Sequence, residues 1–191
     1  MDGSQGPNRR MTQEEVKKAE EQIKLLDKTV ADLASKMTTQ GASPKDAMGV
    51  TSTYLENIYS QAYRLYNTGK YSEATHLFRL LVLLNAMEPK YTLGLAACSH
   101  MLKDYNTAIQ LYTLSSTLDP QNPVPHYHTS DCFIQMKDYL SAMICLELAI
   151  NRAGDNPSFS KMKERAQLSL DSLKQNMGSI SEDAAKPMQN E

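Results

Sequence analysis

Three side chains that could ligate a metal ion stand close together in the chain. They are His126, His128 and Cys132, and the last two are one helical turn apart, as a pair of metal ligands could be. No fourth ligand is apparent for a tetrahedral zinc site. We therefore interpret them as structural residues of a helix, and we expect neither a metal nor any other cofactor.

The chain lacks the residues that common catalytic motifs require. Gly69-Lys70 resembles the end of a phosphate-binding loop, but Arg64 stands where the first glycine must be, and Tyr71 where Ser or Thr must bind magnesium. The sequence contains no Gly-x-Ser-x-Gly elbow and no metalloprotease histidine pair. The sequence thus predicts a protein that is not an enzyme.

Composition indicates one folded domain with tails, since hydrophobic residues make up 41% of the chain and charged residues 22%. The net charge of -2 gives no reason to expect binding to nucleic acid or insertion into a membrane. The start of the sequence lacks the apolar stretch of a secretory signal, and no segment is long enough to span a membrane. The three cysteines form no close-spaced pair, so we expect free thiols and a cytoplasmic location.

The elements that position these residues repeat with a period of 34 residues. Five columns of similar residues share this spacing. They are Tyr71, Tyr105 and Tyr139; Ala74, Ala108 and Ala142; Phe78, Tyr112 and Leu146; Ala62, Ala96 and Ser130; and Pro89, Pro123 and Pro157. Small residues let two helices of a repeat approach closely, and bulky residues fill the space between neighbouring repeats. Because proline suits the first turn of a helix, helices should start at about 89, 123 and 157.

These columns resemble the tetratricopeptide repeat. The resemblance implies an all-α fold of three repeats, 55–88, 89–122 and 123–156, in a right-handed superhelical solenoid that occupies residues 52–176 together with a capping helix from about 157. The apolar face of that helix comprises Phe159, Met162, Ala166, Leu170 and Leu173. Residues 177–191 are polar and are expected to form a disordered tail.

Residues 1–11 are expected to be disordered, and residues 12–51 to form an N-terminal helical segment with a second short helix at 43–49. Its apolar residues follow a heptad pattern. The predicted dimerisation residues are Val16, Ile23, Leu26, Val30, Leu33 and Met37. In a parallel coiled coil Glu15 would face Glu20 of the partner, so another dimer geometry, or folding back on the first repeat, remains open.

The whole layout resembles one family, the bacterial type III secretion chaperones of the SycD/LcrH class. The resemblance covers residues 12–176 and is carried by the segments 55–63 (LENIYSQAY), 69–74 (GKYSEA) and 93–98 (LGLAAC). It implies a homodimeric chaperone in the cytoplasm of a Gram-negative bacterium. Its partner would be a hydrophobic translocator, of which it binds an extended segment in a concave groove to keep the translocator soluble and competent for secretion.

In such repeats the first helix lines the concave groove. The predicted groove residues are Tyr59, Tyr63, Tyr66, Asn67, Leu93, Ala97, His100, Met101, Tyr127, Asp131, Ile134 and Gln135. A tyrosine stripe on a helix can also be ordinary core. Here Ile58, Ala62 and Leu65 already fill the inter-helix positions, so the tyrosines fall on the other face and suit an extended peptide.

Such a groove could serve two other purposes. A clamp for a C-terminal carboxylate would need Lys and Asn where the tyrosines stand, so an acidic-tail co-chaperone is disfavoured. The alternative that remains open is an adaptor whose repeats bridge two folded protein partners.

Overall fold

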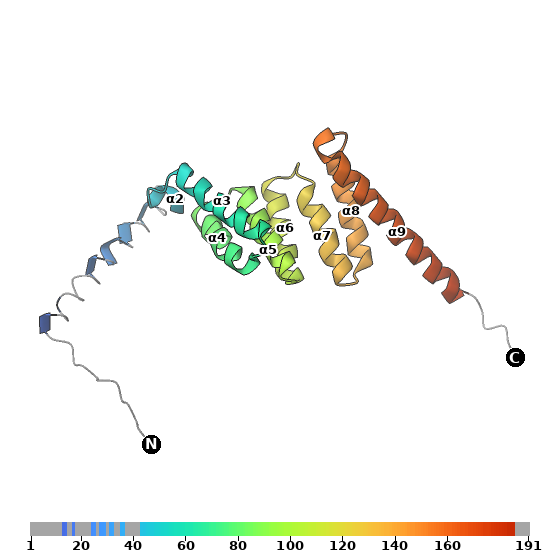
Figure 1. Ribbon diagram of the computed structural model, residues 1–191, viewed down its shortest axis with the longest axis horizontal. Helices are drawn as coiled ribbons and strands as arrows, with labels where there is room; N and C mark the ends of the chain where they lie inside the picture. Colours follow the sequence, from blue (N-terminus) through green and yellow to red (C-terminus); the bar gives the residue numbers. More distant parts are fainter. Residues whose placement is uncertain are drawn as a thin grey trace, which may run out of the picture. The chain divides into compact units, whose positions relative to one another are not determined.

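The computed structural model describes residues 43–185, with side chains as far as residue 176, and residues 13, 14, 17, 24, 25, 27–29, 31, 32, 35 and 36. All the regular elements in these residues are helices. They form two units, residues 1–51 and 52–191. In the second unit the helices α3 to α9 follow one another side by side (Figure 1).

The first unit contains α2 (Pro44–Ala47), which the Ser43 side chain caps by accepting a hydrogen bond from the Asp46 N–H. The described residues between 13 and 36 are helical. The dimerisation residues Val16, Ile23, Leu26, Val30, Leu33 and Met37 lie outside the described residues, as do the tail residues 1–11.

The second unit contains three helix-turn-helix repeats. They are α3 (Ser52–Asn67) with α4 (Tyr71–Leu84), α5 (Pro89–Met101) with α6 (Tyr105–Leu118), and α7 (Val124–Gln135) with α8 (Tyr139–Ala153). Helices begin at or next to the three positions expected, about 89, 123 and 157, whereas the first repeat begins at Ser52 rather than at 55. Pro89 begins α5, Pro123 caps α7 and Pro157 opens a short 3-10 helix, Pro157–Phe159, as expected of proline at helix starts.

The columns of small and bulky residues form the core of the second unit. Ala62, Ala96 and Ser130, and likewise Ala74, Ala108 and Ala142, are 0% exposed. Phe78, Tyr112 and Leu146 are at most 1% exposed. The same close packing therefore recurs in each repeat. The stability of the stack is then approximately the sum of the contributions of these similar interfaces.

The turn inside each repeat has the same backbone conformation. Gly69, Lys103 and Lys137 all have a positive φ, of 78°, 64° and 62° respectively. The N–H of the next residue donates to a carbonyl five residues earlier, at 2.9 Å in each repeat: Lys70 to Leu65, Asp104 to Ser99 and Asp138 to Phe133. This pattern is the Schellman motif, which closes a helix on a left-handed residue.

Helix α9 (Ser160–Ala185) packs on α8 through Ala166 and Leu170, which share a buried cluster with Leu146. The predicted end of this helix at residue 176 was wrong, because the helix continues to Ala185. Residues 186–191 of the predicted tail lie outside the described residues.

Candidate peptide-binding groove

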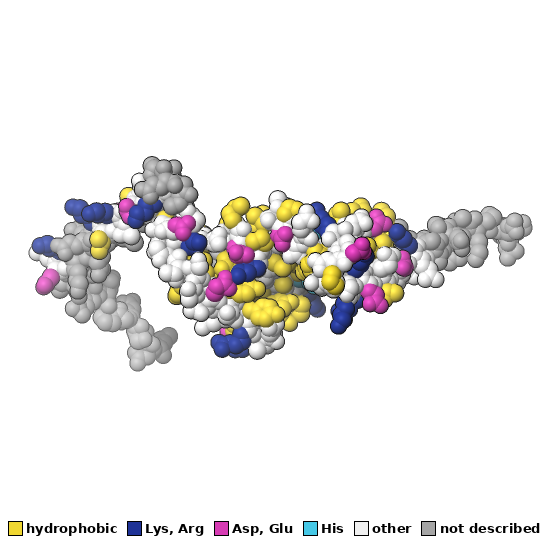
Figure 2. Space-filling view, turned by 90° about the horizontal axis from the view of Figure 1, so that it is seen from above, with side chains coloured by type: hydrophobic (Ala, Val, Ile, Leu, Met, Phe, Trp, Pro, Cys, Tyr) yellow, Lys and Arg dark blue, Asp and Glu magenta, His cyan; other side chains and the backbone are white. Residues whose placement is uncertain are grey.

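A pocket of about 320 Å³ opens where the first helices of the three repeats meet. It is lined by Tyr59, Tyr63, Tyr66, Phe78, Lys90, Leu93, Gly94, Ala97, Val124 and His128. Five of the predicted groove residues therefore lie together here. We call this site the tyrosine pocket. Hydrophobic side chains also lie at the surface of this unit among acidic and basic ones (Figure 2).

Two small residues of α5 make room for the tyrosine pocket. Gly94 and Ala97 both line it. A Cβ atom added to Gly94 would overlap the Phe78 ring, so α5 approaches α4 as closely as the missing side chain allows. The lining of the pocket thus combines small residues of α5 with the aromatic rings of α3 and α4.

The three tyrosines of α3 differ in their surroundings. Tyr59 is half-buried, with its ring centroid 6.0 Å from that of Phe78 and 5.8 Å from that of Tyr91. Tyr66 packs edge-on against Tyr71 at 5.4 Å. Tyr63 is 53% exposed, and among the described residues the one ring that it stacks on is Tyr59, at 6.2 Å. Tyr63 is therefore the ring most available to a ligand.

Burial raises the pKa of Tyr59 and Tyr66 above that of free tyrosine. The hydroxyl groups therefore stay neutral at physiological pH. A neutral phenol can donate one hydrogen bond and accept others, while its ring contacts apolar groups. These side chains can serve both the backbone and the apolar side chains of an extended peptide.

Lys90 is a pocket residue that sequence reasoning missed. Its Nζ atom donates to Glu56 at 2.6 Å and lies 4.9 Å from the centroid of the Tyr59 ring. The hydrogen bond to Glu56 is the main cause that raises the pKa of Lys90. The repeat could have revealed this pair, because Glu56 and Lys90 occupy the same position in successive repeats.

His100 and His128 form a polar patch beside the tyrosine pocket, which His128 lines, with their ring centroids 6.3 Å apart. The His100 Nδ1 lies 3.5 Å from the Tyr112 hydroxyl, and the His128 ring stacks on Tyr112 with centroids 5.7 Å apart. Asp131 lies 3.6 Å from His128. Burial lowers the pKa of His100, so this imidazole favours its neutral form. His128 was not among the predicted groove residues.

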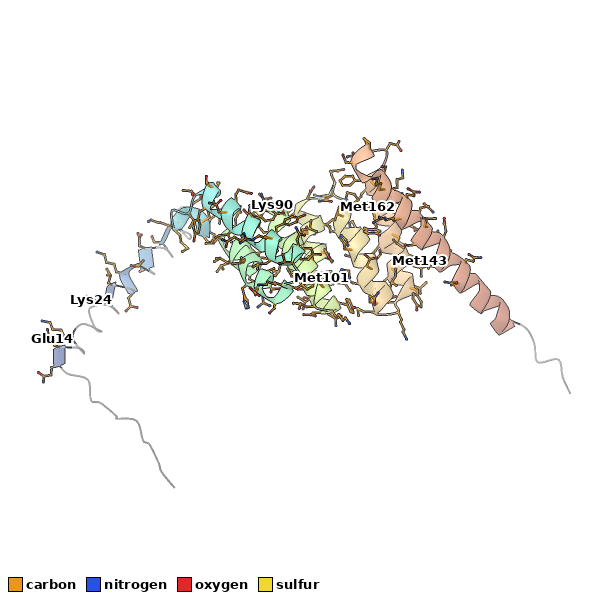
Figure 3. The ribbon with its side chains drawn as sticks, in the orientation of Figure 1. Glu14, Lys24, Lys90, Met101, Met143 and Met162 are labelled. Atoms are coloured by element: carbon orange, nitrogen blue, oxygen red, sulfur yellow. The ribbon has the colours of Figure 1, made fainter. Side chains whose placement is uncertain are left out.

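The other predicted groove residues are more dispersed. Asn67, Met101 and Gln135 are exposed and do not line the tyrosine pocket, and Lys90 and Met101 lie toward opposite ends of α5 (Figure 3). Tyr127 packs against the buried cluster of Leu146, Ala166 and Leu170. Ile134 instead faces α9, in a second pocket.

The side chains first considered as metal ligands contact other groups. His126 contacts Arg152, and Cys132 is 0% exposed. In the described part of the chain no three His, Cys, Asp or Glu side chains are grouped as metal ligands would be. Burial raises the pKa of the Cys98 thiol to about 11 and that of the Cys132 thiol to about 12, so both remain protonated. Among the described helices none could cross a membrane.

Comparison with known proteins identifies relatives of this chain. The tetratricopeptide-repeat model matches residues 55–86 and 89–122, the first two repeats. Chaperone protein SicA of Salmonella typhimurium is 30% identical over 153 residues, which cover 80% of this chain and 90% of SicA.

Two solved structures of a Yersinia enterocolitica chaperone are similar in fold. The type III secretion chaperone SycD in complex with a peptide of the translocator YopD has 29% identity and a TM-score of 0.65, and the match covers 67% of this chain and 98% of SycD. An alternative dimer of SycD has 29% identity and a TM-score of 0.66, with coverage of 67% and 97%.

Proposed function

Since this chain belongs to the type III secretion translocator chaperones of the SycD/LcrH class, we propose that it holds an extended segment of a hydrophobic translocator in its groove. The bound translocator would stay soluble and unassembled until export. The site of action would be the cytoplasm.

The observation that carries this proposal is the tyrosine pocket. It joins residues from three different repeats into one surface of aromatic rings and small residues, with few charges. An apolar side chain of a peptide can fill such a pocket while its neighbours remain along the groove. The solved complex of SycD with a peptide of YopD supports the same use of the fold.

The chaperone would act by occupancy alone, without catalysis, ATP or any cofactor. Covering an apolar segment of the translocator removes that surface from water and from other copies, which opposes aggregation. We also propose a homodimer; the solved dimer of SycD supports the dimeric state, and the heptad pattern of residues 16–37 is our reason for placing the interface in the N-terminal segment.

Co-purification from the native cell, with the bound protein identified by mass spectrometry, tests the proposal. We expect one dominant translocator, which becomes insoluble or is degraded when the gene for this chain is deleted. The adaptor alternative predicts two partners bound at once and no loss of either partner on deletion. That second result would overturn the chaperone proposal.

A further inference from the structure

Helix α9 takes the place of the first helix of a fourth repeat. Ala166 lies 34 residues after Cys132, which lies 34 residues after Cys98, and all three are 0% exposed. Cys132 shares a cluster with Tyr112 of α6, and Ala166 shares one with Leu146 of α8. Since Tyr112 and Leu146 are equivalent positions, the period continues into α9. Positions in α9 can therefore be matched to those of α3, α5 and α7.

The groove surface also continues from α7 to α9. The match aligns Leu168 with Ile134, and the structure brings these two together in a pocket of about 350 Å³. The other lining residues are Ser169, Ser172 and Leu173. Leu168 is 64% exposed, although it lies at the position of the pocket residue Tyr66. This part of α9 is thus an extension of the groove wall.

The same match aligns Lys161 with Tyr59 and Arg165 with Tyr63. Both cations are exposed. Within the described part of the chain, no carboxylate oxygen lies within 4.0 Å of either charged group. The groove wall therefore changes from aromatic at α3 to cationic at α9.

Two other lysines of α9 differ from this pair. Lys163 lies 3.6 Å from Asp155, and Lys174 lies 2.9 Å from Glu147, so the charges of both are compensated within the chain. Arg165, in contrast, lies close enough to α7 for its charge to act on Tyr127. Burial raises the pKa of Tyr127 on α7, and the positive charge of Arg165 partly opposes this increase.

We propose that the client groove extends onto α9, where Lys161 and Arg165 bind an acidic residue of the translocator segment. This inference rests on the proposed chaperone function and adds the chemistry of the client. Hydrogen bonds between such cations and a carboxylate are charge-assisted and directional. An apolar anchor at α3 and an acidic residue at α9 would fix the direction and register of the bound segment.

The test uses short overlapping peptides that tile the co-purified translocator. For the tightest-binding peptide, the variant Lys161→Ala/Arg165→Ala should bind about tenfold more weakly than the parent. The matched control Lys163→Ala/Lys174→Ala removes the same charge from the same helix. It should stay within about twofold of the parent, because its lysines already have partners in the chain.

A second set of peptides, with each Asp or Glu changed to its amide, locates the client residue. One of these amide peptides should bind the Lys161→Ala/Arg165→Ala variant and the parent protein with equal affinity. Such a loss of the difference between the two proteins is the signature of a direct contact. Equal losses in the test and control variants, or the absence of any such peptide, would overturn the inference. Tyr63→Ala in the same titrations keeps the two proposals apart. If it weakens binding and the α9 variant does not, only the extension onto α9 is wrong; if Tyr63→Ala binds normally, the proposed function itself is wrong.

Discussion

At the scale of single residues, the tyrosines of α3 contribute unequally to fold and binding. Tyr59 contacts Phe78 and Tyr91, so its removal would loosen the packing between α3, α4 and α5. Tyr66 helps to hold Tyr71 at the turn. Tyr63 does neither, because within the described part of the chain its one ring contact is with Tyr59 in the same helix. A substitution of Tyr63 therefore separates binding from stability.

Two lysines with a left-handed backbone conformation give a prediction about stability. Lys103 and Lys137 have φ values of 64° and 62°, a conformation that costs a residue with a Cβ atom about 1 to 2 kcal/mol and costs glycine little. Lys103→Gly and Lys137→Gly should each raise the free energy of unfolding by about 0.5 kcal/mol, once the extra flexibility of the unfolded chain is subtracted. Urea unfolding would measure this. Lys70→Gly, at a position with φ of -85°, is the control and should not stabilise.

Two half-buried histidines predict a dependence of stability on pH. Burial lowers the pKa of His100, and burial together with Arg152 lowers that of His126, below the ordinary value of 6.5. Because the unfolded chain then binds protons more readily, their contribution is present above pH 6.5 and is lost as the pH falls through the lowered values. Melting temperatures should fall on acidification, and less so for His100→Asn/His126→Asn. The same decrease in the variant would contradict this assignment.

At the scale of elements, the helices of the repeats could be predicted because each contact recurs at the next repeat. The pocket residues Phe78, Lys90, Gly94, Val124 and His128 were missed. A pocket between repeats depends on how closely their helices stack, which the face of a single helix does not determine. The end of α9 was also missed, because the polar composition of residues 177–191 predicted a tail rather than helix.

Substitutions at the crowded positions between helices should reduce stability, whereas substitution of the exposed Tyr63 should not. Ala62 is 0% exposed, so Ala62→Leu must displace its neighbours and should cost about 1 to 3 kcal/mol of stability. Thermal melts would measure this, with Ser60→Leu on an exposed position of the same helix as the control. An unchanged melting temperature for Ala62→Leu would show that the two helices of the repeat are not closely packed.

At the scale of the whole molecule, the apolar seam of residues 16–37 must be buried somewhere. We predict a homodimer through this seam, and Leu26→Glu should convert it to a monomer, because two buried carboxylates would face an apolar surface. Light scattering at several concentrations measures the mass. A parent that is monomeric throughout, or a variant that remains dimeric, would contradict the prediction.

The most direct test of the central claim compares binding and folding in one variant, Tyr63→Ala. The account predicts that affinity for the co-purified translocator falls by about 2 kcal/mol, as for an aromatic hot spot, while the melting temperature stays close to that of the parent because Tyr63 is 53% exposed. Tyr54→Ala, which replaces a tyrosine of α3 that is 57% exposed and does not line the tyrosine pocket, is the matched control and should bind normally. Calorimetric titrations and thermal melts on the same samples measure both quantities. Normal affinity in Tyr63→Ala, or parallel losses of affinity and stability, would contradict the account.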